Sequence, residues 1–269
     1  MSNGTISWMS AFLAALLGSA LGLRCVVRSV RHRQGWRPGW LALGAASMGC
    51  GVWMTHFIAM ADFHAPGATV TFDPERTVVS LMAAVLVVGI GMFVVGYRGA
   101  RPVVLGVSGT VIGLGVAATH YLGMSAMHVN AAVHQRAPLV VLSLVIAVGA
   151  ATAALWYAVS SRGLFSSLVA SLVMAVAVMG THFTATAAIV LRVHPMAAQA
   201  VQSGRNAVDV LPLLIAPGCF LLLATAIVLF DPLFLGGEAD WSLEPPAPVP
   251  PPSENHVSDV YLTYPPARR

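Results

Sequence analysis

Long apolar stretches separated by short polar connections dominate the chain as far as about residue 235. A helix needs about 20 apolar residues to cross a bilayer core, so this pattern predicts seven transmembrane helices. The expected ranges are 6–27, 39–62, 77–97, 102–125, 138–159, 164–190 and 210–231. The sequence therefore predicts an all-α, polytopic integral membrane protein, with its membrane domain over residues 1–235. Residues 236–269 are proline-rich and lack apolar periodicity, which predicts a disordered tail.

Composition excludes a soluble globular domain. Hydrophobic residues make up 57% of the chain and charged residues only 9%, whereas soluble domains carry about 25% charged residues. All 14 basic residues are arginines, and most of them fall in short connections between apolar runs rather than on one face. This placement is typical of topology signals and gives no support to nucleic-acid binding. We therefore expect the lipid bilayer to be the chain's main environment.

The arginines also predict an orientation. One of them, Arg24, lies near the end of the first span, four more follow it before the second span and none precedes it, so we expect a retained first helix rather than a cleaved signal peptide. Further arginines fall in the next two connections on the same side of the membrane, at Arg98, Arg101 and Arg162. By the positive-inside rule the N-terminus is expected outside and the C-terminal tail in the cytoplasm.

A threefold repeat is the most informative feature of the sequence. A threonine, a histidine and an aromatic residue occur together at His56, His120 and His182, in the second half of each even-numbered span. These histidines are separated by 64 and then 62 residues. We infer three repeated two-helix units, over about 6–63, 77–127 and 138–190, followed by an extra seventh span.

The first two copies share a longer pattern. Each has a methionine four residues after the histidine, Met60 or Met124, and a second histidine four residues later, His64 or His128. A spacing of four places such residues on one face of a helix. The third copy has Thr186 in place of the methionine, and we expect fewer ligands from it. Additional candidate ligands are Met127 and Met179.

The predicted topology directs all three motifs toward the outer leaflet. Bundling of the even-numbered helices would gather His56, His120 and His182 around one pseudo-threefold centre. Glycines on these helices would permit the necessary close approach. They are Gly44, Gly49 and Gly51 on the second span and Gly109, Gly113 and Gly115 on the fourth.

Histidines inside membrane spans are costly and indicate function. One interpretation is neutral imidazoles that form hydrogen bonds between helices. The leading interpretation is a metal site, because imidazole binds zinc, copper, iron and nickel, while a thioether favours Cu(I). Copper fits a His/Met set best, and zinc fits less well because its sites rarely use methionine. The preceding threonines, Thr55, Thr119 and Thr181, either orient the histidines or bond to a carbonyl one turn earlier.

At these residues the sequence resembles the MHYT domain family of bacterial membrane modules. The resemblance covers about residues 6–235 and includes the paired spans, the repeated motif and the seventh span. It implies a sensory module in the bacterial plasma membrane that binds copper near the outer face, and through it oxygen, CO or NO. The implied ligands are Met54, His56, Met60, His120, Met124 and His182. Departures from the motif occur at Ala118 and Gly180, which replace the methionine found at Met54, and at Thr186.

Larger members of that family continue into cytoplasmic modules that make or hydrolyse cyclic di-GMP. Here only a short tail follows, so the resemblance implies a separate cytoplasmic signalling partner. Our leading hypothesis is a copper-binding, non-enzymatic sensory or regulatory module. The alternative is a metal-ion transporter or channel with the same cluster as its entry site. A haem protein or redox enzyme is a third interpretation, which requires histidines on facing helices to ligate the iron.

Overall fold

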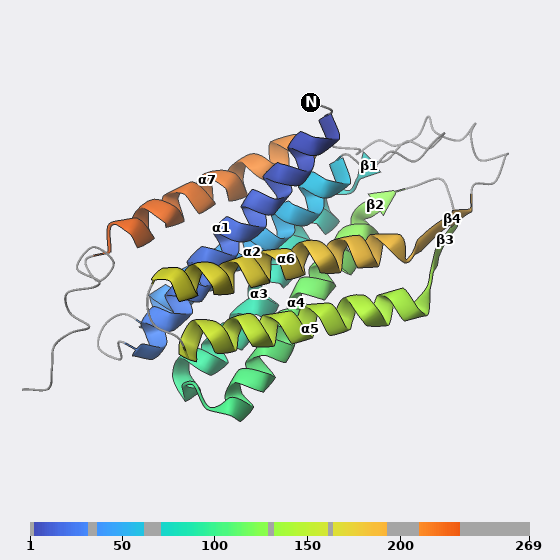
Figure 1. The fold of residues 1–269 in the computed structure, drawn as a ribbon. Helices are drawn as coiled ribbons and strands as arrows, with labels where there is room; N and C mark the ends of the chain where they lie inside the picture. Colours follow the sequence, from blue (N-terminus) through green and yellow to red (C-terminus); the bar gives the residue numbers. More distant parts are fainter. Residues whose placement is uncertain are drawn as a thin grey trace, which may run out of the picture. The chain divides into compact units, whose positions relative to one another are not determined.

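The computed structural model describes residues 3–31, 37–61, 71–128, 132–160, 164–192 and 210–231. Within them lie seven helices, all long and apolar enough to cross a membrane. They are α1 (Asn3–Arg31), α2 (Arg37–Ala61), α3 (Pro74–Arg98), α4 (Pro102–Ala126), α5 (Ala137–Ser160), α6 (Leu164–Ala187) and α7 (Val210–Leu229) (Figure 1). Every predicted boundary lies within four residues of the observed one. The predicted fold class is confirmed, and the whole of the predicted tail lies outside the described residues.

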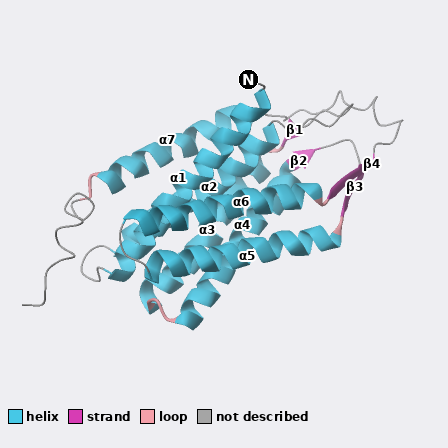
Figure 2. Ribbon diagram, viewed as in Figure 1, coloured by secondary structure: helices cyan, strands magenta, loops and turns pink. Residues whose placement is uncertain are grey.

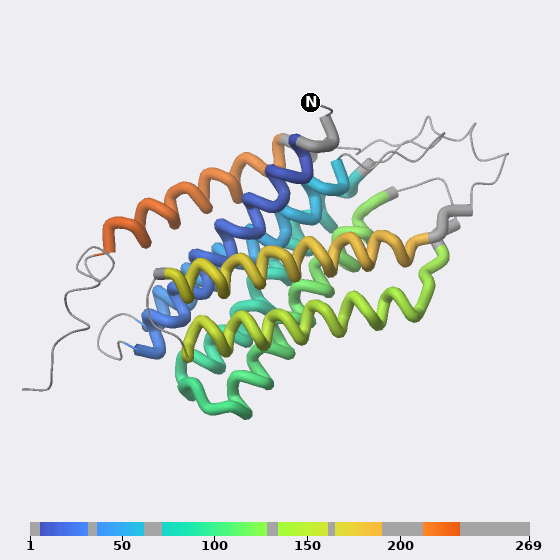
Figure 3. Tube along the Cα trace, viewed as in Figure 1, coloured from blue at the N-terminus to red at the C-terminus, as the bar shows by residue number. Residues whose placement is uncertain are grey.

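The first six helices pack as a ring. Each helix contacts its neighbours in the sequence, and α1 closes the ring against α6. Consecutive helices run antiparallel, as the chain trace shows (Figure 3). The most extensive contacts are within α1–α2, α3–α4 and α5–α6, the three predicted two-helix units. Contacts among α2, α4 and α6 bring together the three helices that carry the repeated motif.

Two short antiparallel strand pairs lie at the end of the ring where the even-numbered helices end (Figure 2). Strand β1 (Thr71–Phe72) pairs with β2 (Met127–His128), and β3 (Ala132–Gln135) pairs with β4 (Ile189–Arg192). Each pair joins the start of one two-helix unit to its end. The sequence analysis assigned no strands here. Segments of two to four residues are too short to show the alternation that identifies a strand.

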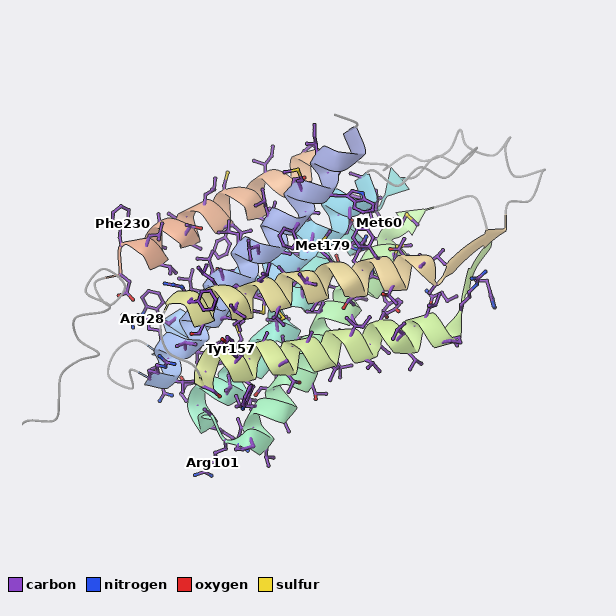
Figure 4. All side chains as sticks on the ribbon, in the orientation of Figure 1. Arg28, Met60, Arg101, Tyr157, Met179 and Phe230 are labelled. Carbon is purple, nitrogen blue, oxygen red and sulfur yellow. The ribbon has the colours of Figure 1, made fainter. Side chains whose placement is uncertain are left out.

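Arginines lie at the opposite end of the ring. The Arg31 guanidinium donates a hydrogen bond to the carbonyl of Val159 in the last turn of α5, at 3.3 Å. Arg37, the first residue of α2, donates to the carbonyl of Gly96 near the end of α3. Figure 4 labels Arg101 at this end of the helices and Met60 nearer the strands. The two hydrogen bonds satisfy carbonyls that a helix end leaves unpaired, and they link neighbouring helices.

Glycines set the distance between α1 and α2. A Cβ added to Gly51 would lie 2.8 Å from both the Cα of Gly18 and the carbonyl oxygen of Ala14, so the two backbones touch there. Five of the six glycines singled out in the sequence lack room for a side chain, and a Cβ added to the sixth, Gly115, would lie 3.1 Å from Val87. The expectation that they bring the even-numbered helices together was wrong, because their nearest neighbours lie on α1, α3 and α5.

We expect Gly51→Val to force α1 away from α2. Overpacking of this kind costs about 1–3 kcal/mol, and thermal unfolding in detergent should shift downward accordingly. Gly149→Val on α5 is the matched control, because nothing lies within 4 Å of a Cβ added there. An equal shift for both variants would contradict the close packing.

Candidate metal centre

His56 on α2, His120 on α4 and His182 on α6 converge near the strand-bearing end of the ring. Their side chains are only 3%, 3% and 5% exposed. One ring nitrogen from each lies within 4.8 Å of the corresponding nitrogens of the other two. Among the described residues, these three histidines form the one group of histidine, cysteine or acidic side chains that is close enough together to hold a metal ion. Residues more than 60 positions apart in the sequence therefore form a single cluster.

Two of the three pairs of nitrogens are as close as a shared cation requires. Nδ1 of His182 lies 3.3 Å from Nδ1 of His56 and 3.2 Å from Nδ1 of His120. Two nitrogens bound tetrahedrally to one metal at about 2.0 Å lie about 3.3 Å apart. His182 is thus the member of the cluster in short contact with both of the others.

Hydrogen bonds between the imidazole rings cannot pair all of these ring nitrogens. A neutral ring nitrogen carries either one proton or one lone pair, and Nδ1 of His182 faces two partners at once. Among the described residues, Nε2 of His56 and Nε2 of His120 have no hydrogen-bond partner although both are buried. A metal held by the three Nδ1 atoms would take up all three Nδ1 lone pairs, while Nε2 of His56 and Nε2 of His120 would remain N–H groups without a partner in the described residues. The donor set therefore fits a metal ion better than a set of interhelical hydrogen bonds.

Aromatic rings hold the cluster in place. Each histidine lies roughly edge-on to the aromatic residue that follows it, with ring centroids 4.8 Å apart at Phe57, 5.2 Å at Tyr121 and 5.4 Å at Phe183. Tyr121 is fixed in turn, since its hydroxyl forms a 2.9 Å hydrogen bond with Ser143 on α5.

A small cavity adjoins the histidines on the side toward the middle of the helices. Its volume is about 10 Å³, close to what one water molecule needs. Beside the three histidines, its lining consists of a valine and a threonine from each even-numbered helix, Val52 and Thr55, Val116 and Thr119, and Val178 and Thr181. Each copy of the motif is thus Val-x2-Thr-His. The sequence analysis missed the valines, although their identity in all three repeats was a signal that could have found them.

The three threonines are not equivalent. Thr55 donates to the carbonyl of Gly51 at 2.7 Å or of Ala11 at 3.1 Å, and Thr119 donates to the carbonyl of Gly115 at 2.8 Å. Bonding to a carbonyl one turn earlier was one of the two predicted roles. Thr181 is 1% exposed, and its hydroxyl has no partner in the part of the chain that the structure describes.

The predicted methionine ligands lie in an apolar cluster beside the histidines. Met60 is buried there with Trp53, Phe57 and Phe72, and Met54, Met124 and Met127 pack against the same group. The methyl group of Met54 also lies 3.6 Å from a Cβ added to Gly218, so this side chain reaches toward α7.

The remaining predicted ligands are not brought to the cluster by any described contact. Met179 is half-buried on α6, one turn before His182 (Figure 4). The backbone of His128 is part of β2, but its side chain lies outside the described residues, as does all of His64.

Gly123 provides the space that the His56 ring occupies. A Cβ added to Gly123 on α4 would overlap Nε2 and Cδ2 of His56. The sequence analysis did not single out this glycine. Its only signal was its place in the repeat, where the other two copies have Ala59 and Ala185.

Comparison of the sequence with known protein families finds the same internal repeat. Residues 49–107 and 113–171 each match the MHYT repeat, described as the N-terminal repeat of bacterial signalling proteins. The chain belongs to the MHYT family. The two matched segments begin 64 residues apart, as do His56 and His120, so the family repeat coincides with the one that builds the cluster.

Relatives of this MHYT chain are signalling proteins. It is 40% identical over 194 residues to the cyclic di-GMP phosphodiesterase NbdA of Pseudomonas aeruginosa, covering 68% of this chain and 24% of that protein. It is 32% identical over 183 residues to the bifunctional diguanylate cyclase/cyclic di-GMP phosphodiesterase MucR of the same organism, covering 66% and 27%. The chain thus spans about a quarter of the length of these relatives. No solved structure shows a significant match.

Proposed function

We propose that this protein is a sensory membrane module that binds one copper ion through His56, His120 and His182. The observation that carries the proposal is the convergence of three buried histidines, one from each repeat, in which Nδ1 of His56 and Nδ1 of His120 lie 3.3 and 3.2 Å from Nδ1 of His182. Imidazole alone also suits zinc, iron and nickel. Copper is favoured by the thioethers of Met60 and Met124, which lie in the adjoining apolar cluster and offer soft ligands to Cu(I).

The chemistry supplied by copper would be a change of redox state or the binding of a small gas such as oxygen, CO or NO. The protein's own residues would bind the ion, exclude bulk water and fix the imidazole rings. Burial of all three histidines and the small volume of the adjoining cavity support this role. The proposed role is non-catalytic.

The signal would pass along the helices that carry the ligands. The α2 helix that ends beyond His56 begins at Arg37, whose guanidinium is bonded to the last turn of α3. A shift of α2 would therefore alter contacts at the far end of the ring. With the orientation predicted from the arginines, that end faces the cytoplasm, where a separate signalling partner or a fused output domain would read it.

Transport of the metal has less support. Eight residues before the histidines, toward the middle of the helices, stand Met48, Ile112 and Met174, all at most 2% exposed. They pack with the cavity valines in one apolar cluster. An ion pathway needs polar or thioether groups at several depths, and this layer offers the thioethers of Met48 and Met174 but no polar side chain. A haem is equally disfavoured, because nitrogens in such short contact leave no room for a porphyrin between them.

A chimaera tests the sensory role. The cytoplasmic part of the phosphodiesterase NbdA would be joined after Arg269 of the full chain, and cyclic di-GMP hydrolysis would be measured in proteoliposomes with and without copper. We expect copper to change the rate in the chimaera and to have no effect once His182 is replaced by alanine. Copper uptake into the same vesicles, with no change in hydrolysis, would favour the transporter instead.

A further inference from the structure

The repeats place three threonines around the cavity, and among the described residues only the Thr181 hydroxyl lacks any hydrogen-bond partner. Thr55 and Thr119 are committed to backbone carbonyls. Thr181 is equally buried and lines the same cavity, yet its Oγ1 has no partner among the described residues. Buried hydroxyls without partners are uncommon, because leaving one unpaired costs free energy.

The cavity has room for a ligand no larger than one water molecule. Its volume of about 10 Å³ is near the minimum for a single water molecule. A buried water molecule also needs two or more polar partners. Thr181 is one candidate, and the histidines of the cluster line the same cavity. The three valines provide no polar atom, so the threonine of the third repeat decides where such a ligand is held.

We propose that the Thr181 hydroxyl binds a single water molecule beside the three histidines and thereby determines which small ligand the site accepts. The inference rests on the proposed function, because this water would share the site with the metal. In this proposal the third repeat positions the water molecule, although it lacks the methionine that follows the histidine in the other two repeats. Thr181 is accordingly a positioning residue, and its counterparts in the other repeats serve the helix backbone.

Matched substitutions separate this role from a structural one. Thr181→Val removes the hydroxyl and preserves the side-chain shape, whereas Thr181→Ser keeps the hydroxyl. Thr119→Val is the control, since it makes the same change at the equivalent position, where the hydroxyl is already bonded to Gly115. Each full-length protein is loaded with Cu(II), washed, and analysed for its copper content before any spectroscopy.

Pulsed electron paramagnetic resonance in D₂O then reports on exchangeable water beside the copper. We expect strongly coupled deuterons in the wild type, in Thr119→Val and in Thr181→Ser, and their loss in Thr181→Val. The inference would be overturned if Thr181→Val and Thr119→Val both kept the deuteron signal, or if both lost it to the same extent. It would also be overturned if the wild type showed no such signal. If Thr181→Val fails to retain copper, Thr181→Ala is measured by the same criterion. A wild type that retains no copper would instead refute the proposed metal site itself.

Discussion

His182→Ala is expected to weaken copper binding more than His56→Ala or His120→Ala does. His182 takes part in both short Nδ1 contacts of the cluster, at 3.2 and 3.3 Å. Removing either of the other histidines leaves one close pair of nitrogens, whereas removing His182 leaves neither of these pairs. Loss of residues that merely orient metal ligands costs about 10–100-fold in affinity, so we expect His182→Ala to cost at least about 100-fold.

Competition titration with a copper chelator of known affinity, on protein in detergent, measures this difference. His134→Ala is the matched control, because His134 lies exposed on β3 away from the cluster. It should bind copper as the wild type does. Equal affinities for His182→Ala and His134→Ala would contradict the assignment of His182 to the site, and equal losses for all three cluster variants would contradict its central position.

Gly123→Ala is expected to lower copper affinity by about 10-fold although no ligand is removed. The new methyl group would occupy the place of Nε2 and Cδ2 of His56. The imidazole must then rotate or α2 must move away from α4, and in either case Nδ1 of His56 leaves its position beside His182. The loss of copper affinity would therefore result entirely from displacement of the His56 imidazole.

Gly106→Ala is the control for this variant, because it makes the same change on α4 where nothing lies within 4 Å of the added Cβ. Copper titration should separate the two, and thermal unfolding without metal checks that both proteins remain folded. Wild-type affinity in Gly123→Ala, or an equal loss in both glycine variants, would show that packing against His56 does not position the site.

The sequence was sufficient to predict the helices and the three central histidines. Membrane spans require an uninterrupted apolar run, which makes both their number and their ends visible. The internal repeat then predicted which residues would lie close together, because His56, His120 and His182 occupy equivalent positions in three similar two-helix units. Confirmation of this convergence shows that an internal repeat contains information about contacts between helices far apart in the chain.

Details that depend on side-chain direction were not predictable. Met54 stands only two residues before His56, a spacing that does not share a helix face, and its methyl group lies toward Gly218 on α7. Three identical threonines have different partners: Thr55 also reaches the carbonyl of Ala11 on α1, Thr119 bonds within its own helix, and Thr181 has no partner among the described residues. Helix rotation and the local distance between helices decide such contacts, and neither is encoded in a residue's place within a repeat.

The central claim is that one metal ion is held by one histidine from each repeat. Metal content tests it most directly, measured by mass spectrometry after copper loading and washing of protein purified with a tag that contains no histidine. The wild type is compared with the variant in which His56, His120 and His182 are all alanine. We predict copper close to one ion per chain in the wild type and none in the variant. Equal copper in both proteins, or none in either, would contradict the account and leave the three histidines as contacts between helices.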